Sequence, residues 1–170
     1  MPTYIALLRA VNVGGTGKLP MIELKAMCED AGFTKVKTYI ASGNVVFQSK
    51  LSETKVKSAL ESALASYAGK PVGVVIRTAV EMAAVLAANP FPNAPTNKTV
   101  AIFLDQAPPA NALQTVSNQT TEQLEAGLRE IYGYYPEGQG QSKLKIPAAK
   151  TGTARNMNTV AKLVEMAGEM

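Results

Sequence analysis

The order of apolar patterns along residues 3–77 constrains the fold more than any other feature of this sequence. Short apolar or alternating runs, rich in β-branched and aromatic residues, predict strands over residues 3–11, 34–41, 44–49 and 72–77. Apolar residues recur at helical spacing after the first of these strands and again after the third. The predicted order is therefore strand, helix, strand, strand, helix, strand.

Residues with known positional preferences mark the ends of the two helices. Pro20 suits the first turn of the first helix, and Gly32 suits its end. Ser52 is a good N-cap for the second helix, which Gly69 is predicted to end. The predicted buried face of the second helix consists of Val56, Ala59, Leu60, Ala63, Leu64 and Tyr67.

This order predicts an α+β fold whose N-terminal half is ferredoxin-like, with βαββαβ topology. In that topology the first and second strands run parallel, so they end at the same edge of the sheet. The glycine-rich loop of residues 12–20 should therefore lie beside the turn formed by Ser42, Gly43 and Asn44. Topology alone would bring together two polar segments that are far apart in the sequence.

The rest of the chain predicts a smaller, related α+β half. Thr78 and Glu81 have the spacing of a capping box and open a further helix. The proline-rich stretch over residues 89–97 predicts a linker between one domain at 1–88 and a second domain at 98–170.

Beyond the linker, the patterns predict a strand, a short helix, a hairpin and a final helix. The strand covers residues 99–105, and the short helix contains Leu113. Gly127 and the alternation that follows it favour a hairpin over a helix for residues 121–136. The final helix is predicted to begin near Asn158.

Composition excludes several classes of function. The chain has no histidine, which excludes Ser-His-Asp and Cys-His catalysis and histidine-ligated zinc. Cys28 is the single cysteine, so no intrachain disulfide can form, and its place on an apolar helix stripe favours a buried inert thiol over a nucleophile. We therefore predict no metal site and no cofactor.

The sequence also predicts a cytoplasmic protein without a membrane partner. No apolar run approaches the roughly 20 residues of a membrane span. The N-terminus has no basic leader and no small-residue cleavage site ahead of the first strand.

Residues 134–159 form a polar and basic segment. No acidic residue occurs between Glu137 and Glu165, and lysines and an arginine are spread over this interval. Ser142 is predicted to cap a turn or a short helix, with Lys143 and Lys145 beside it. One interpretation is a site for an anionic partner, and the other is a surface that the lysines simply keep solvated.

Arg155, Asn156 and Asn158 lie around the predicted start of the final helix. Exposed backbone amides at a helix start, together with a guanidinium, would hold a phosphate or a carboxylate. Alternatively, one asparagine is only the N-cap and Arg155 pairs with a local carbonyl or acid. The sequence leaves both interpretations open.

The loop NVGGTGKL after the first strand lacks the nucleotide-binding patterns that it suggests. A phosphate loop would need glycine in place of Asn12 and serine or threonine in place of Leu19. The dinucleotide fingerprint would need glycine in place of Pro20. A flexible loop with Lys18 near a helix start remains, and it either binds an anion or only connects strand to helix.

A ferredoxin-like sheet can also bind RNA through aromatic residues on its two central strands. Tyr4 and Phe47 occupy those strands, but SGNVVFQS lacks the basic residue and the glycine that precede the aromatics of RNA-binding sheets. Core packing is the predicted role of Phe47.

Five segments in this order and spacing resemble the uncharacterised bacterial family catalogued as domain of unknown function 1697: ALLRAVNVGG, SGNVVF, NPF, YYPEGQGQSKL and TARNMNTVAKL. The resemblance spans nearly the whole chain and implies a cytosolic α+β protein without an established reaction. Met157 departs from the family pattern, because relatives often carry tryptophan there. The family's motif positions in this chain are Arg9, Asn12, Gly14, Gly15, Ser42, Gly43, Asn44, Ser142, Lys143, Leu144, Arg155, Asn156, Asn158 and Thr159.

The leading functional hypothesis is a binding module for a phosphate-bearing ligand, either nucleic acid or nucleotide. One alternative is a metal-independent enzyme acting on a small anionic metabolite, with Lys143 and Tyr134 as candidate chemical groups. The other is a protein–protein adaptor, which would expose a large apolar patch. In the leading hypothesis charge comes from Arg9, Lys18, Lys143 and Arg155, and hydrogen bonds come from Asn12, Asn44, Asn156 and Asn158.

Overall fold

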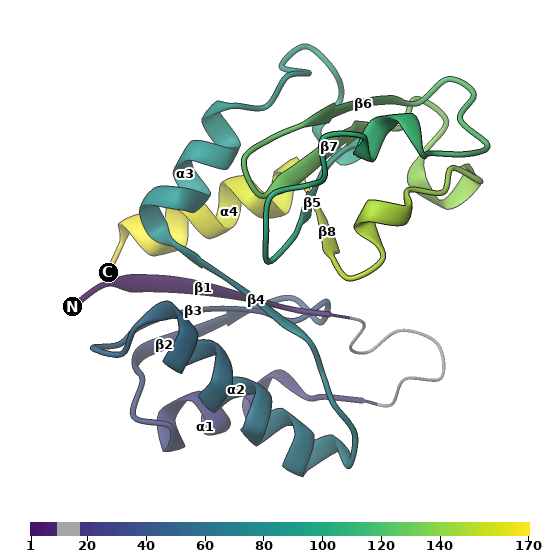
Figure 1. Ribbon diagram of the computed structural model, residues 1–170. Helices are drawn as coiled ribbons and strands as arrows, with labels where there is room; N and C mark the ends of the chain where they lie inside the picture. The colour runs from purple at the N-terminus through teal and green to yellow at the C-terminus, as the bar shows by residue number, and fades with distance from the viewer. Residues whose placement is uncertain (10–17) are drawn as a thin grey trace. The chain divides into compact units, whose positions relative to one another are not determined.

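The computed structural model describes residues 1–9 and 18–170, and the chain divides into two compact units (Figure 1). Unit 1 consists of Met1–Met82 and Leu163–Met170, and unit 2 consists of Ala83–Lys162. Both units contain an antiparallel sheet, and the chain carries four α-helices in the described ranges, so the predicted α+β class is confirmed. No helix in these ranges has the length and apolarity needed to cross a membrane.

The sheet of unit 1 has four strands in the order β2-β3-β1-β4, and every neighbouring pair is antiparallel. The bounds are β1 Thr3–Leu8, β2 Thr34–Tyr39, β3 Asn44–Gln48 and β4 Val74–Thr78. The element order over these strands is the predicted strand, helix, strand, strand, helix, strand. The closer assignment as ferredoxin-like stays a prediction.

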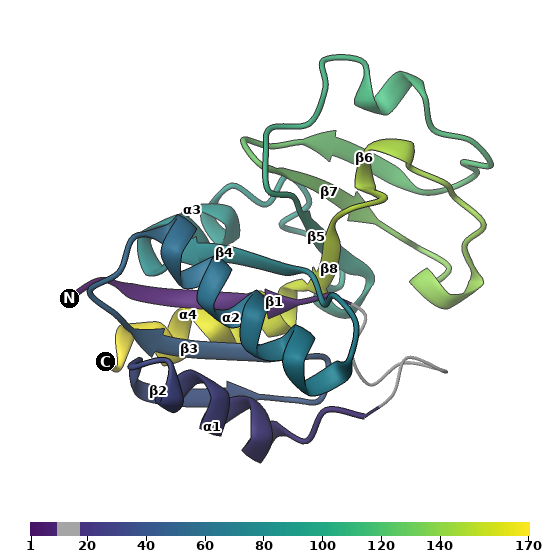
Figure 2. The ribbon, with the colours of Figure 1, turned by 60° about the horizontal axis from the view of Figure 1, so that its bottom comes forward.

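Two helices, α1 Met21–Asp30 and α2 Glu53–Ala68, cover one face of this sheet (Figure 2). The predicted N-cap of α2 is confirmed, because Ser52 Oγ accepts a hydrogen bond from the N–H of Lys55 at 3.4 Å. Gly69 ends α2 in the left-handed conformation, with φ of 72°, which a residue without Cβ adopts readily.

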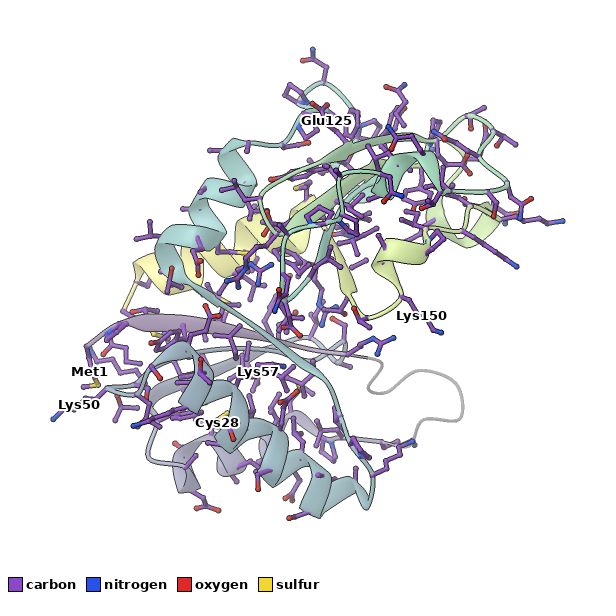
Figure 3. All side chains as sticks on the ribbon, in the orientation of Figure 1. Met1, Cys28, Lys50, Lys57, Glu125 and Lys150 are labelled. Carbon is purple, nitrogen blue, oxygen red and sulfur yellow. The ribbon has the colours of Figure 1, made fainter. Side chains whose placement is uncertain are left out.

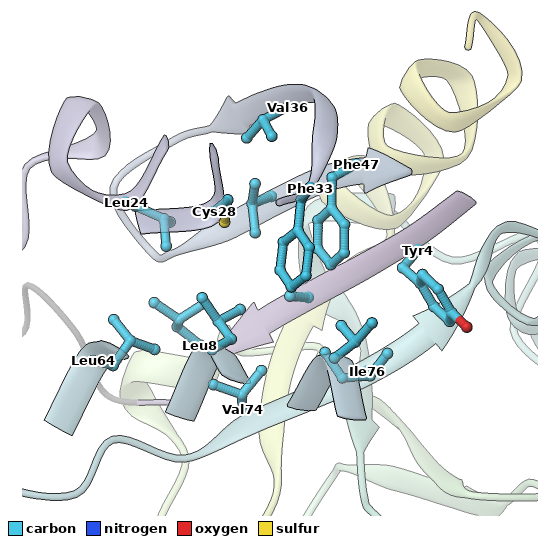
Figure 4. Packing of buried hydrophobic residues seen from close by; sticks show 14 of the residues in the cluster. Tyr4, Leu8, Leu24, Cys28, Phe33, Val36, Phe47, Leu64, Val74 and Ile76 are labelled. Atoms are coloured by element: carbon cyan, nitrogen blue, oxygen red, sulfur yellow. The ribbon is translucent and has the colours of Figure 1, made fainter. Parts of the chain in front are cut away.

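The core between helices and sheet is aromatic at its centre (Figure 4). Phe47 is fully buried and stacks on Phe33 with ring centroids 4.3 Å apart, which confirms its predicted core role. Burial raises the pKa of the Cys28 thiol to about 12, in agreement with the predicted inert thiol. Tyr67 was predicted to lie on the buried face of α2, and this is wrong: the last turn of α2 is solvated and Tyr67 is 47% exposed.

The sheet of unit 2 has the order β6-β7-β5-β8, again with antiparallel neighbours. The bounds are β5 Thr99–Phe103, β6 Gln123–Ala126, β7 Glu130–Tyr134 and β8 Thr153–Asn156. The predicted hairpin is confirmed, since β6 and β7 pair around Gly127. The sequence did not predict β8, because this strand is only four residues long and three of the four are polar.

Both faces of the second sheet are covered. On one face lies the hydrophobic core of unit 2, centred on Val100, Ile102 and Ile131. On the other face the hydroxyl of Tyr132 donates to the carbonyl of Val85 in helix α3 (Ala79–Ala87) at 3.0 Å. Burial, and then the charge of Glu130, raise the pKa of Tyr132 to about 12.

The two sheets also share their pairing register. The third residue of the first strand faces an arginine of the last strand in both: Ile5 faces Arg77, and Ala101 faces Arg155. At the end of β1, the N–H of Leu8 donates to the carbonyl of Gly43 at 2.8 Å. Directly after β5, the N–H of Leu104 donates to the carbonyl of Arg129 at 2.9 Å. Unit 2 therefore repeats the strand arrangement of unit 1 residue by residue along its central strand.

A capped helix follows each of these arginines. Thr78 Oγ1 accepts from the N–H of Glu81 at 3.1 Å, and Glu81 Oε1 accepts from the N–H of Thr78 at 2.8 Å, which confirms the predicted capping box of α3. Asn156 Oδ1 accepts from the N–H of Thr159 at 2.9 Å at the start of α4 (Met157–Gly168). Each cap bonds the N–H three residues further on, so the two junctions are equivalent.

The units differ in the segments that connect the first strand to the second and the third strand to the fourth. In unit 1 the connections are α1 and α2, whereas in unit 2 the corresponding segments are residues 104–122 and 135–152. These segments contain only 3₁₀ turns, at η2 Ala112–Gln114, η3 Gln139–Gln141 and η4 Pro147–Ala149. A further 3₁₀ turn, η1 Thr96–Lys98, precedes β5. The second of these helix-free connections, residues 135–152, contains most of the basic segment.

The division into units passes through two helices. It falls after Met82 within α3 and after Lys162 within α4. These positions differ from the predicted bounds of 1–88, 89–97 and 98–170, which rested on the proline-rich composition of the connection.

Replacing either helix cap by alanine should destabilise the protein by a similar amount. Thr78→Ala and Asn156→Ala each remove the acceptor of one first-turn N–H, so the free energy of unfolding should fall by about 1 kcal/mol in each. Denaturant unfolding measures both values, and Ser66→Ala on the exposed last turn of α2 is the control. A loss in only one of the two cap variants would contradict their equivalence.

Candidate functional site

Three exposed lysines of unit 2 lie in the connection between β7 and β8, within eight residues of the sequence. We call Lys143, Lys145 and Lys150 the lysine row. Exposure alternates along the backbone at its start: Lys143 and Lys145 are exposed, whereas Leu144 and Ile146 are half-buried and pack against the core of unit 2. This alternation is typical of an extended backbone that covers a core, so the cations are directed to solvent.

Backbone hydrogen bonds tie the lysine row to the neighbouring connection. The N–H of Lys145 donates to the carbonyl of Ser117 at 2.9 Å, and the N–H of Ser117 donates to the carbonyl of Lys145 at 3.0 Å. Lys150 follows the turn η4, and its side chain projects away from the ribbon (Figure 3). The Ser117–Lys145 backbone pair therefore helps to hold the lysine row in place.

A side-chain contact, the Glu122–Ser142 clamp, joins the start of the row to the same connection. Ser142 Oγ donates to Glu122 Oε2 and accepts from the N–H of Leu144 at 3.1 Å. Glu122 Oε1 accepts from the N–H of Thr120 at 2.7 Å and from its hydroxyl at 3.2 Å. The hydrogen bond from Ser142, followed by those from Thr120, lowers the pKa of Glu122 to about 2. The clamp therefore contains an ionised carboxylate, and Glu122 is only 7% exposed.

Arg155 does not belong to the row. It was predicted at an exposed helix start, but it lies within β8 and is 7% exposed. Its Nη1 donates to Thr153 Oγ1 at 2.6 Å and to the carbonyl of Ala154 at 2.9 Å, and burial lowers its pKa to about 10. Ala154 packs against the core that the row covers, so strand alternation puts Arg155 on the opposite face of the sheet.

The polar residues after Arg155 make hydrogen bonds within the fold. Asn156 is the N-cap of α4, which was one of the two open interpretations. Asn158 is exposed, and its Oδ1 accepts from the hydroxyl of Thr96 at 2.6 Å. Thr159 is buried and donates its N–H to the cap.

In unit 1 the predicted site residues meet at one edge of the sheet. The N–H of Leu8 donates to Gly43, so the end of β1 lies beside the turn between β2 and β3, as the topology predicted. Arg9 is exposed there, and its N–H donates to the carbonyl of Gly73 at 2.9 Å. A Cβ on Gly73 would lie 3.5 Å from the Arg9 stem, so the two are in contact.

The remaining residues of this edge include some with structural roles. Asn44 is fully buried, and its Nδ2 donates to the carbonyl of Tyr39 at 2.9 Å and to Ser42 Oγ at 3.0 Å, which closes the turn. Gly43 has φ of 90°, a conformation that favours glycine. Lys18 is exposed ahead of α1. Asn12, Gly14 and Gly15 were also predicted as ligand residues, and they lie outside the described residues.

The sequence identified Lys143 as a candidate site residue, but it did not identify the contacts that hold the lysine row in place. Lys145 was noted beside Ser142 and Lys150 only as part of the basic segment, although the alternation in SKLKI is a period-2 signal for an extended backbone. The sequence did not single out Glu122. Its hydrogen bond to Ser142 spans 20 residues, and no local pattern encodes that contact.

Comparisons with known proteins were consistent with the fold. The model of a family described as "Protein of unknown function (DUF1697)" matches residues 1–132. No curated protein matches the chain. The lysine row lies beyond the residues that the family model matches.

A solved structure has a similar fold over nearly the whole chain. It is described as the conserved bacterial protein SP0830 from Streptococcus pneumoniae, and it shares 24% sequence identity with a TM-score of 0.79. The likeness covers 98% of this chain and 98% of that chain. At this level of identity the likeness concerns the fold alone.

The low pKa of Glu122 predicts that the clamp contributes stability in a pH-dependent way. A carboxylate whose pKa falls from 4.5 to about 2 on folding stabilises the folded state above pH 4.5 and loses this effect as the pH falls towards 2. The gap in unfolding free energy between the wild type and Glu122→Gln should therefore shrink from about pH 5 to about pH 3. Denaturant unfolding at both pH values measures this gap, with Glu125→Gln on exposed β6 as the control. An unchanged gap would contradict the role of the ionised carboxylate.

Arg155→Ala should lower stability. The change leaves the hydroxyl of Thr153 without its donor and removes a buried side chain, so the free energy of unfolding should fall by about 1–3 kcal/mol. Denaturant unfolding measures the loss. An unfolding free energy equal to that of the wild type would mean that the buried guanidinium is not a structural element of β8.

Proposed function

We propose that this chain, which belongs to the DUF1697 family of proteins of unknown function, is a binding module for a phosphate-bearing ligand, either a nucleic acid or a nucleotide. The lysine row is the observation that carries the proposal. Its three cations project to solvent from one connection of unit 2, on backbone that is tied to its neighbour. The site is Lys143, Lys145 and Lys150, with Ser142 as a support.

The charge around the row favours an anionic partner. No acidic residue lies between Glu137 and Glu165 in the sequence, so the segment that carries the row has a positive net charge. Glu122 is the acid bonded to this segment through Ser142, and its carboxylate is largely buried and already accepts three hydrogen bonds. Lysine ammonium groups are compact charges on flexible stems, which suits phosphate oxygens without demanding one fixed geometry.

The arrangement supports binding rather than chemistry. Ser142, the hydroxyl nearest to Lys143 in the sequence, already donates to Glu122. A carboxylate with a pKa of about 2 is a weak base and would not activate that hydroxyl as a nucleophile. The Glu122–Ser142 clamp therefore gives no support to Ser142 as a nucleophile.

Removing the lysines singly should weaken the binding of a labelled oligonucleotide. One surface charge near a phosphate contributes roughly 1 kcal/mol, so Lys143→Ala and Lys145→Ala should each raise the Kd about fivefold at low salt. Each variant should also reduce the slope of log K against log salt by about 0.7–0.9, because one fewer counterion is released. Fluorescence anisotropy at several salt concentrations measures both quantities.

A matched control separates the row from general surface charge. Lys50→Ala removes an exposed lysine of unit 1 and should leave the affinity and the slope close to wild-type values. Equal losses in Lys50→Ala and the row variants would contradict a localised site. A wild-type protein that binds neither oligonucleotides nor nucleotides at low salt would contradict the proposed function itself.

A further inference from the structure

We propose that the ligand of the lysine row is a nucleic-acid strand, bound through successive backbone phosphates, and that Glu122 is a positioning residue for that binding. This inference rests on the proposed function and names its ligand class and its support. Two independent observations carry it: the spacing that an extended backbone imposes on the row, and the clamp that fixes the start of the row.

The backbone of the row separates its cations. Lys143 and Lys145 lie two residues apart on the same side of an extended segment, which puts their Cα atoms about 6.6–6.8 Å apart. Lys150 follows after the turn η4, five residues beyond Lys145 in the sequence. Cations that are spaced along a connection suit a ligand with several spaced phosphates, whereas a mononucleotide offers its charge at one place.

The absence of an α-helix from residues 135–152 explains why the row needs support. In unit 1 the segment between the third and fourth strands is α2, whose own hydrogen bonds define its shape. In unit 2 the equivalent segment has 3₁₀ turns and an extended stretch, so contacts with residues 104–122 must define it. The described contacts of this kind near the row are the Ser117–Lys145 backbone pair and the Glu122–Ser142 clamp.

The clamp fixes the direction in which the row begins. Ser142 Oγ accepts from the N–H of Leu144, so one hydroxyl sets the turn on either side of Lys143. The same hydroxyl donates to Glu122, which is itself held by Thr120. Loss of the carboxylate would remove one of the two hydrogen bonds of the Ser142 hydroxyl and would loosen the turn that carries Lys143.

Charge and positioning predict opposite effects for the same substitution. Glu122→Gln removes a negative charge close to the row, and long-range electrostatics alone would then strengthen the binding of a polyanion. The positioning role predicts weaker binding, because the row loses its preorganised geometry. The sign of the change therefore decides between the two effects.

The experiment compares the binding of a fluorescein-labelled oligouridylate of about 20 nucleotides, and of UTP, to the wild type and to clamp variants. Glu122→Gln and Ser142→Ala should each raise the Kd for the oligonucleotide about fivefold, the equivalent of one hydrogen bond of about 1 kcal/mol. Ser142→Thr keeps the hydroxyl and should restore most of the affinity. The salt slope should stay at its wild-type value in all three variants, because no cation is removed. UTP should bind roughly 5- to 25-fold more weakly than the oligonucleotide, because it leaves one or two of the three lysines without a phosphate.

The controls test the positioning role of Glu122 and the polymeric nature of the ligand separately. Glu125→Gln removes an exposed acid from β6 and should leave the affinity unchanged or slightly increased. Glu122→Gln that binds as tightly as the wild type, or more tightly, overturns the positioning role. UTP that binds as tightly as the oligonucleotide overturns the polymer ligand. If Glu122→Gln fails to fold, the comparison of Ser142→Ala with Ser142→Thr decides the positioning role. A wild type that binds neither probe marks the failure of the proposed function instead.

Discussion

Each unit of this protein depends on a central strand that is hydrogen-bonded on both sides. β1 pairs with β3 and β4, and β5 pairs with β7 and β8, so these two strands fix the register of everything beside them. That shared register puts Arg77 and Arg155 at equivalent places and puts a helix cap directly after each. The units differ in the segments that cover one face of the sheet. In unit 2 one of these segments carries the lysine row.

Much of the fold followed from periodicity and from capping residues. Helix starts with a local chemical signal, at Ser52 and Thr78, were predicted correctly because the contact lies within three residues. β8 was missed because its strand character comes from pairing with β5 and not from its own four residues. Because β8 was missed, Arg155 was predicted at an exposed helix start. Its position within a strand instead buries the side chain.

The candidate site was predicted in its charge and not in its geometry. Lys143 was singled out from the basic segment, and the alternation with Leu144 shows why it is exposed. The support from Glu122 is a contact between two connections that no short-range pattern reports. Asn44 and Asn156 were predicted as ligand residues because amides suit ligands, but the same amides here satisfy the backbone of a turn and of a helix start.

The most direct test of the account is to locate the bound polyanion on the wild-type protein. Acetylation of surface lysines, followed by mass spectrometry, reports the reactivity of each lysine with and without an oligonucleotide. The account predicts slower acetylation of Lys143, Lys145 and Lys150 in the complex, and unchanged rates at exposed lysines of unit 1 such as Lys25 and Lys50. Unchanged rates along the row while the oligonucleotide is bound would contradict the account, because the ligand would then lie elsewhere on the protein.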